Sequence, residues 1–360
     1  MLQLGVPLRF ESDYMIPYFI ILFSILLWLN LEKYSLNRKA FWVPLLLLSI
    51  FAGVRSSRVG TDSGTYTSDF RNQLNLEYFV FREDIEYGYQ LLSYIILNFT
   101  HNYFWLFFIS SIIVVGSYLH LFKKISKDYF LSIYIFITFG FYTFYFNGLR
   151  QGLAMAVAIW ATPYLIERKI FNFSLLIVVA SFFHKSALIM FFMYLIVNLK
   201  VKLEYKLVST FLGSFFLSSL VIEYLASENE RYTAYTSSSE NAGGYLVLGI
   251  FLLFGIIFYF LNNTKNIFDR SEYILLQLYL IGLTFLIPVA LLGTNPSGPQ
   301  RLLFYFVWPI TILLPTILLK INIKLIYLLF ITLSGIYFYL RTSRFSNLTP
   351  YQINEIFRIF

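Results

Sequence analysis

Apolar runs that recur along nearly the whole chain are the feature that most constrains its fold. A helix that crosses the hydrocarbon core of a bilayer needs about 20 mostly apolar residues. The runs therefore predict an all-α polytopic membrane protein, in which the shorter runs extend into the polar residues that flank them. We expect about twelve transmembrane helices, near residues 14–31, 40–54, 103–122, 129–146, 153–166, 170–183, 187–199, 207–225, 245–261, 273–292, 303–319 and 325–340.

The composition supports this class and excludes several kinds of site. Only 13% of the residues are charged, against about 25% in a typical soluble domain. There is no cysteine, which excludes disulfides, thiolate nucleophiles and zinc–thiolate centres. With three histidines a His-rich metal centre is not expected, and we predict neither a metal nor a cofactor. The first residues lack the basic segment and cleavage site of a signal peptide, so we expect the first apolar run to stay in the mature protein.

Six short basic patches between the runs predict the orientation of the chain. They hold fifteen Lys and Arg against six Asp and Glu, whereas the rest of the chain holds twelve against thirteen. By the positive-inside bias these patches are cytoplasmic, so both termini and the polar segments at the opposite ends of the spans are external. The net charge of +8 is thus distributed as in a membrane protein, and no nucleic-acid partner is expected. The patches are residues 32–39, 123–128, 167–169, 200–206, 262–272 and 320–324.

Residues 86–99 are apolar, but they are too short for a comfortable span and begin with a charge. A thirteenth span would also place some of the basic patches outside. We therefore expect a helix that lies at the external interface, within one large external loop at 55–102. A second external loop is expected at 226–244, and the whole chain, 1–360, is expected to form a single integral-membrane domain.

The first external loop opens with charged side chains directly after an apolar run. Arg55, Arg58 and Asp62 lie within a stretch of eight residues. Charges at the end of a span are costly to misplace, and a planar guanidinium suits phosphate oxygens. Asp62 could act as a base or orient a hydroxyl group. The alternative is that the arginines only anchor the span at the interface and Asp62 only stabilises a turn.

Two further motifs place charges at expected helix starts. Glu86 opens the interfacial helix, where the helix dipole favours a carboxylate, so it is either a structural cap or a base or hydroxyl acceptor. Arg150 and Gln151 follow Asn147 and Gly148 at the start of the next span, where free backbone amides favour an anion. The alternative for this motif is a helix cap followed by an interfacial arginine.

His184, Lys185 and Arg301 also fall on the external side. His184 could bind phosphate as a cation or transfer a proton near neutral pH, although a lone interfacial His is more often an anchor. Arg301 follows a Pro/Gly-rich break at 293–300. Non-helical backbone at this depth is tolerated only where it lines an aqueous or protein-buried cavity, so we expect Arg301 at the site rather than as a simple loop anchor.

The second external loop contributes weaker signals. Arg231 and Tyr232 lie in it, and an aromatic face there could stack on a sugar ring. By the predicted orientation all the charged motifs share one membrane depth. We therefore expect Arg55, Arg150, His184 and Arg301 to surround a single cavity that opens to the outer side and binds an anionic, lipid-linked substrate.

In this order the motifs resemble those of the EpsG family of Wzy-like bacterial polysaccharide polymerases. The resemblance spans nearly the whole chain, and the ordered set is more specific than any one motif. Residues 226–244 match only through Arg231-Tyr232 and a Gly-Gly pair. The other matching elements are Arg55, Gly60-Thr61-Asp62, Tyr66, Glu86-Tyr87-Gly88-Tyr89, Asn147-Gly148-Leu149-Arg150-Gln151, Phe183-His184-Lys185-Ser186-Ala187, Arg301 before Tyr305, and Pro350-Tyr351.

The resemblance implies a membrane glycosyltransferase of the GT-C type that joins lipid-linked oligosaccharide repeat units at the outer face of the cytoplasmic (inner) membrane. The growing chain on undecaprenyl pyrophosphate is then the donor, the next lipid-linked repeat unit the acceptor, and undecaprenyl pyrophosphate the leaving group. The lipid bilayer and a chain-length regulator are further expected partners. Whether the product is a lipopolysaccharide O-antigen, a capsule or an exopolysaccharide stays open.

The resemblance also assigns roles to individual side chains. Asp62, Glu86 and His184 are the candidates for the base, with Asp62 favoured. Substrate binding is expected from the arginines, Tyr66, Gln151, Lys185 and Tyr232.

Three other classes compete with this interpretation. A transporter (flippase) of lipid-linked oligosaccharide would also need a cationic cavity, but it must expose its site to both faces and often shows two related halves. Here the charged motifs collect on one side and no internal repeat is apparent. A membrane O-acyltransferase would need a buried His–acid pair within the spans, and a scaffold for polysaccharide export would not explain the arginines. The transporter is the strongest alternative.

Overall fold

The computed structural model describes residues 12–228, 244–293 and 298–357. These residues form helices and no strand, apart from one isolated antiparallel bridge between Arg55 and Ile353. The α-helices are α1 (Ile16–Leu36), α2 (Trp42–Gly53), α3 (Ser63–Tyr66), α4 (Ser68–Arg71), α5 (Tyr87–Leu97), α6 (Phe104–Ile125), α7 (Tyr129–Thr138), α8 (Phe141–Asn147), α9 (Leu149–Ile166), α10 (Ile170–Ser181), α11 (Ile189–Asn198), α12 (Leu203–Glu228), α13 (Tyr245–Lys265), α14 (Arg270–Leu291), α15 (Leu303–Val307), α16 (Ile310–Ile321) and α17 (Lys324–Arg344). Short 3₁₀ helices are η1 (Ser12–Met15), η2 (Leu76–Tyr78), η3 (Lys185–Leu188), η5 (Pro299–Leu302) and η6 (Glu355–Phe357).

Among these elements, six are long and apolar enough to cross a membrane. They are α1, α6, α7 joined to α8, α13, α14 and α17, and the bent pair of η5–α15 with α16 would make a seventh. Three more apolar helices, α2, α10 and η3 with α11, are shorter. Helical structure occurs at all twelve predicted positions, which confirms an all-helical, membrane-embedded protein. The number of twelve spans and the GT-C-like arrangement stay predictions.

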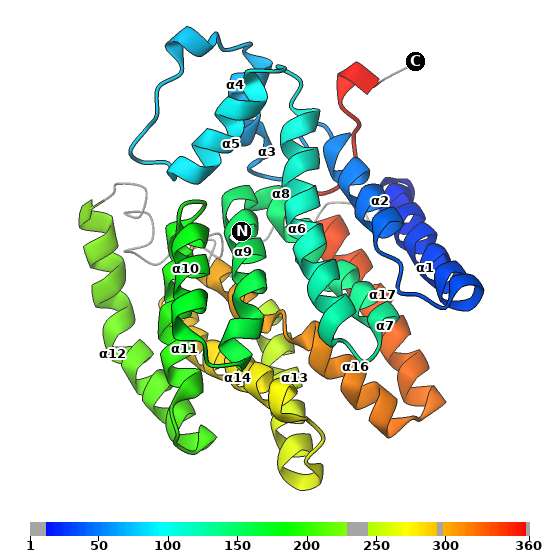
Figure 1. The fold of residues 1–360 in the computed structure, drawn as a ribbon, viewed down its shortest axis with the longest axis vertical. Coiled ribbons are helices and arrows are strands. Elements are labelled where there is room, and N and C mark those ends of the chain that lie inside the picture. The colour runs from blue at the N-terminus through cyan, green and yellow to red at the C-terminus, as the bar shows by residue number, and fades with distance from the viewer. Residues whose placement is uncertain (1–11, 229–243, 294–297, 358–360) are drawn as a thin grey trace, which may run out of the picture.

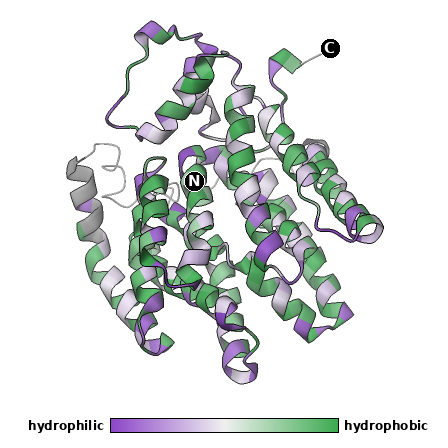
Figure 2. Ribbon diagram, viewed as in Figure 1, coloured by the Kyte–Doolittle hydropathy of each residue, from purple (hydrophilic) through white to green (hydrophobic). Residues whose placement is uncertain are grey.

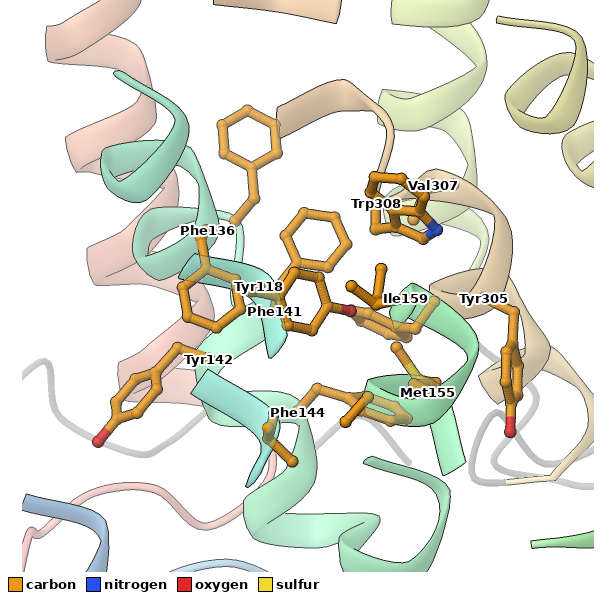
Figure 3. Close-up of a cluster of buried hydrophobic side chains, with 14 of the residues drawn as sticks. Tyr118, Phe136, Phe141, Tyr142, Phe144, Met155, Ile159, Tyr305, Val307 and Trp308 are labelled. Atoms are coloured by element: carbon orange, nitrogen blue, oxygen red, sulfur yellow. The ribbon is translucent and has the colours of Figure 1, made fainter. Parts of the chain in front are cut away.

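The helices pack side by side as a bundle (Figure 1). Many of the side chains buried in it are aromatic. In the 18-residue apolar stretch of α7–α8, 94% of the residues are buried within the protein. The same share is 22% for α13 and 17% for α17. The central segment contributes Phe136, Phe141 and Tyr142 to the cluster of buried side chains in Figure 3. Figure 2 shows mostly hydrophobic residues along the helices and many of the hydrophilic ones in the connections at their ends.

The central segment breaks at Gly140, within the predicted span 129–146. Gly140 has φ +77°, a conformation that costs glycine little but ends the helix. A side chain could not replace it, because its first carbon would lie 0.8 Å from Nη1 of Arg341. The apolar pattern of the sequence gives no signal for this break, which directs α8 toward the start of α9.

Residues 55–102 lie across one end of the bundle, as Figure 1 shows for α3, α4 and α5. The predicted helix within 86–99 is confirmed as α5, whose 11 residues span about 16 Å and so cannot cross a bilayer. The short helices α3, α4 and η2 were not predicted. At this end, the backbone N–H of Gly88 donates to the carbonyl of Phe182 at 2.7 Å, which seats α5 against the end of α10.

The segment 346–357, here called the C-terminal segment, packs against the beginning of the same loop. The N–H of Ser56 donates to the carbonyl of Gln352 at 2.7 Å, and the N–H of Gly60 donates to the carbonyl of Asn347 at 2.9 Å. Tyr351 donates its hydroxyl to the carbonyl of Phe51 and stacks on the Phe51 ring. The C-terminal segment therefore holds the point at which α2 becomes the loop.

The opposite end of the bundle has its own buried carboxylate, Glu272, in the first turn of α14. Its Oε2 accepts from Lys127 Nζ at 2.8 Å and from the N–H of Asp269 at 3.0 Å, and its Oε1 accepts from the Thr316 hydroxyl at 2.5 Å. Asp269 completes a capping box with it. This cluster joins the ends of three long segments, α6, α14 and α16.

Candidate functional site

The first pair of charged groups joins the start of α5 to the start of α9. Glu86 is the residue before α5, and its Oε2 accepts a hydrogen bond from Nη1 of Arg150 in the first turn of α9. Its Oε1 accepts the backbone N–H of Lys185 at 3.3 Å. The Glu86 side chain is only 8% exposed and that of Arg150 15%, so the ion pair is largely shielded from solvent. Three segments far apart in sequence thus meet at one carboxylate.

A second pair lies beside it and is more accessible. Nη1 of Arg301, in η5, lies 3.1 Å from Oδ2 of Asp62, and the two side chains are 25% and 36% exposed. Gln151 links the two pairs, because its Nε2 donates to the Arg301 carbonyl at 2.9 Å while its neighbour Arg150 holds Glu86. The site therefore contains two adjacent arginine–carboxylate pairs.

The Tyr66 hydroxyl is affected electrostatically by both ion pairs. Burial raises the pKa of Tyr66, Asp62 adds to this effect, and Arg150 and Arg301 oppose it. Arg150 also lies within hydrogen-bonding reach of this hydroxyl. The ring packs edge-on against Tyr89 of α5, with the centroids 5.6 Å apart. Tyr66 therefore stands where the electrostatic fields of the two ion pairs overlap.

His184 belongs to a polar chain on the other side of Glu86. Its Nδ1 lies 2.7 Å from the Ser186 hydroxyl and accepts the Ser186 N–H at 3.2 Å. The Ser186 hydroxyl in turn lies 3.2 Å from that of Tyr305. His184 caps η3 through this arrangement, so its ring orientation is set by the turn that carries Lys185.

Asn147, at the end of α8, positions Asp62 by binding the residue before it, Thr61. Its Oδ1 accepts the N–H of Thr61 at 2.6 Å and the Thr61 hydroxyl at 3.1 Å. Gly60 has φ +98°, and a side chain there would lie 2.8 Å from the carbonyl of Phe146. The Gly-Thr-Asp motif is therefore pressed against the α8–α9 junction, and this close approach requires the glycine.

Arg55 lies apart from this cluster, in the aromatic core. It is fully buried, with its guanidinium 3.5 Å from the centre of the Phe107 ring and 4.0 Å from that of Phe146. Its Nη1 donates to the carbonyl of Ala52 at 2.6 Å, and its Nε and Nη2 have no partner among the described residues. The guanidinium is thus enclosed between rings rather than facing the two ion pairs.

Of the other predicted residues that the structure describes, Arg58 and Lys185 make no side-chain hydrogen bond or ion pair to the cluster. Arg58 is exposed, and within the described residues its side chain makes no hydrogen bond or ion pair. The Lys185 side chain is likewise exposed, although its backbone binds Glu86. Arg231 and Tyr232 lie outside the described residues, as does most of the second external loop.

Sequence reasoning overlooked three side chains that build the site. Asn147, Ser186 and Tyr305 each stood inside or next to a motif, but none was predicted to act. Asn147 bonds Thr61, 86 residues away, and Ser186 bonds Tyr305, 119 residues away. Pairings over such separations leave no local pattern in the sequence. The signal available was only that each of the three stands within four residues of a charged one, Asn147 before Arg150, Ser186 after Lys185 and Tyr305 after Arg301.

The arrangement is suited to an anion with several oxygens. Arg150, Arg301 and Lys185 are cations on separate segments, and a partly exposed arginine can exchange a carboxylate for a phosphate through the same fork of donors. In the described part of the chain, no three His, Asp or Glu side chains lie close enough together to hold a metal ion. The predicted independence from metal stays a prediction.

Fold and site together define the class: a polytopic, all-helical membrane protein with a cationic site built at one end of its bundle. The chain belongs to the EpsG family, whose model matches residues 38–353. The family comprises membrane proteins related to Wzy-like polysaccharide polymerases. No curated protein and no solved structure matches the chain.

Proposed function

We propose that the protein is a polysaccharide polymerase, a GT-C-like glycosyltransferase that joins undecaprenyl-pyrophosphate-linked oligosaccharide repeat units at the outer face of the cytoplasmic membrane. The single observation that carries this proposal is the pair of adjacent arginine–carboxylate contacts, Arg150–Glu86 and Arg301–Asp62, linked through Gln151. A pyrophosphate leaving group needs fixed positive charge, and a hydroxyl acceptor needs a carboxylate. The site supplies both side by side.

The reaction follows from these charges. The hydroxyl oxygen of the acceptor sugar forms a bond to the anomeric carbon of the donor, and the bond from that carbon to the pyrophosphate oxygen breaks. The electron pair leaves with undecaprenyl pyrophosphate, whose growing charge is met by Arg150 and Arg301. The hydroxyl proton passes to a carboxylate. An inverting displacement is expected, because one carboxylate accepts a proton and none is needed as a nucleophile.

The two carboxylates differ in ways that suggest different tasks. Glu86 is held by both Arg150 and the N–H of Lys185 and is nearly enclosed, so it is suited to orienting the cations. Asp62 is more exposed and has one arginine partner. An entering pyrophosphate that binds Arg301 would release Asp62 to act as the base. His184, already bonded through Nδ1 to Ser186, is the second candidate for this role.

The location of the site relative to the membrane is part of the proposal. The basic patches lie at the end of the bundle away from residues 55–102, as the positions of Lys127 and Arg270 show, so the site end is expected to be external together with both termini. Donor and acceptor lipids would enter from the outer leaflet. A chain-length regulator would have to approach from the same side.

The proposal is tested by reconstitution of the purified protein with undecaprenyl-pyrophosphate-linked repeat units that are accessible to the external face. The expected result is a ladder of longer lipid-linked chains together with released undecaprenyl pyrophosphate. If the wild-type protein makes no longer chains but moves the lipid across the bilayer, the polymerase assignment is wrong and the protein is a transporter.

A further inference from the structure

An apolar groove opens directly beside the charged cluster. It has a volume of about 540 Å³ and lies between α5, α6 and the end of α10. Its walls include Tyr87, Leu91 and Ile95 from α5, and Val179 and Phe182 from α10. These five side chains are each between 39% and 54% exposed, so within the described protein the groove is unfilled.

The composition of α5 shows that this groove faces a hydrophobic occupant. Tyr87, Leu91 and Ile95 are spaced four residues apart, so they form one stripe on the helix. The polar side chains Gln90 and Ser93 are on the buried face instead. The buried face also carries Tyr89, Ile96 and Leu97, so the exposed stripe is a second apolar face, and turning it to water would be unfavourable.

The groove is continuous with the ion-pair cluster through the chain itself. Tyr87 and Gly88 line it and follow Glu86, and Phe182 and Phe183 line it and precede His184. The two walls are fastened to each other at that end, where the Gly88 N–H donates to the Phe182 carbonyl. The lining residues Tyr87 and Phe183 thus directly follow Glu86 and directly precede His184, and Glu86 in turn binds Arg150 and the Lys185 N–H.

We propose that this groove binds the hydrocarbon tail of the lipid-linked substrate, with the pyrophosphate at Arg150 and Lys185 and the first isoprene units along Tyr87, Leu91 and Phe182. This inference rests on the proposed function and adds the path by which one lipid enters. An anionic head and an apolar tail in a single molecule match the cationic end and the apolar length of the same site.

A second groove in the molecule provides a comparison. It lies along α1 and is lined by Ile16, Phe19, Ile20 and Phe23, among others, with a volume of about 700 Å³. It is apolar and exposed, as expected of a surface that faces bulk lipid, and none of its lining residues adjoins the charged cluster. It is therefore the matched control for general contact with lipid.

The experiment uses the full-length protein in vesicles that contain phosphatidylglycerol and an undecaprenyl pyrophosphate analogue with a photoreactive diazirine in its first isoprene units. After illumination, cross-linked peptides are identified by mass spectrometry. Adducts are expected in 87–95 and 179–183. Unlabelled undecaprenyl pyrophosphate should reduce them at least about tenfold, and extra phosphatidylglycerol should not. Adducts on α1 should be fewer and should not respond to the competitor.

Substitutions that fill each groove sharpen the test. Leu91→Trp should reduce adducts at 179–183 about tenfold and slow polymerisation, whereas Ile20→Trp in the α1 groove should change neither. The wild-type cross-linking pattern decides the matter even if Leu91→Trp does not fold. Adducts spread equally over both grooves, or displaced equally by phosphatidylglycerol, would overturn the inference. If adducts spread in this way but polymerisation is normal, the proposed function stands and only the groove assignment is wrong. If polymerisation is absent but the adducts at α5 are reduced by the competitor, the proposed function alone is wrong.

Discussion

Glu86 and Glu272 are two carboxylates at helix starts, at opposite ends of the bundle, and each pairs with a cation from another segment of the chain. Glu272 is almost fully satisfied, because Lys127, Thr316 and the Asp269 backbone occupy its two oxygens. Glu86 binds Arg150 and, at the longer distance of 3.3 Å, the N–H of Lys185. The two ends carry similar charged groups, but the carboxylate of Glu272 has more hydrogen-bond partners than that of Glu86.

The difference separates a structural polar cluster from one that can act. Around Glu272, Lys127 binds both carboxylates of the cluster, Asp269 and Glu272, and the cluster ties long helices together. Around Glu86 the exposed ammonium of Lys185 and the partly exposed Arg301 keep donors available. A buried ion pair is weak evidence for stability, whereas cations that keep free donors in a membrane protein indicate a binding site. The predictions below test this contrast.

The largest effect is expected for Arg150→Ala. Loss of one fixed donor to a developing anion costs about 3–4 kcal/mol of transition-state stabilisation, a rate lower by about a hundredfold to a thousandfold. Polymer length in the reconstituted assay measures it. Single repeat units should still reach the outer face, because the change affects chemistry and not transport. Arg150→Lys should rescue poorly, since it keeps the charge but loses the fork of donors. Full rescue by lysine would show that charge alone suffices.

Glu272→Gln should affect stability instead of activity. Removing one partner of a buried pair costs about 3–5 kcal/mol, but Lys127 is partly exposed and keeps Asp269, so we expect a loss of about 2 kcal/mol in the free energy of unfolding. Thermal denaturation in detergent measures it, and the rate per folded molecule should be unchanged. The matched control is Glu167→Gln, whose pair with Lys169 is exposed and screened by solvent, so its loss should leave the thermal denaturation unchanged within error. A lower rate in the Glu272 variant would remove the distinction between the two ends.

Asn147→Leu should have a smaller effect, on the rate. The substitution removes the oxygen that accepts from Thr61 and so loosens Asp62, a positioning loss of about 1 kcal/mol or about fivefold. The bond is internal to the protein, so kcat should fall while KM for the lipid-linked acceptor changes little. Asn147→Asp keeps an acceptor and should recover most of the rate. A change confined to KM would mean that Asn147 contacts substrate directly.

Arg55→Met should change activity by less than about threefold. Its guanidinium is enclosed by Phe107 and Phe146 and leaves two buried nitrogens without partners among the described residues, and an apolar side chain of similar length is often tolerated in such a place. The comparison is Arg301→Met, which should reduce polymerisation severely. Equal losses in the two variants would support the sequence-based prediction that Arg55 binds pyrophosphate.

The smallest effect, none within error, is expected for removal of divalent metal. Arginine and lysine can neutralise the leaving pyrophosphate without a bridging cation. Activity should persist in chelator. If it disappears and returns with Mg²⁺ or Mn²⁺, the cations of the site are not sufficient by themselves, and Asp62 with Glu86 becomes the first candidate ligand set.

The sequence predicted the helices well, because apolar length is a local property. The helix predicted within 86–99 from its length and leading charge was found as α5. The break at Gly140 was not predicted, since its positive φ and the Arg341 guanidinium of a distant helix, which fills the space beside it, leave no local pattern in the sequence. Arg55 shows the same limit. An arginine after an apolar run can face a site or a core, and the rings of Phe107 and Phe146 that decide between them come from other helices.

The contacts between the C-terminal segment and the first loop have a consequence for the order in which the site forms during synthesis. Residues 51 and 351 are separated by 300 positions, yet their contact and those of Ser56 and Gly60 fasten the start of the loop that carries Asp62. During synthesis the loop and the early helices emerge long before the C-terminal segment that holds them has been translated. A chain that lacks these residues is therefore expected to leave the start of its charged loop unfastened. Because Tyr351 follows Phe51 by 300 positions, the site is completed only once this much later segment has been translated.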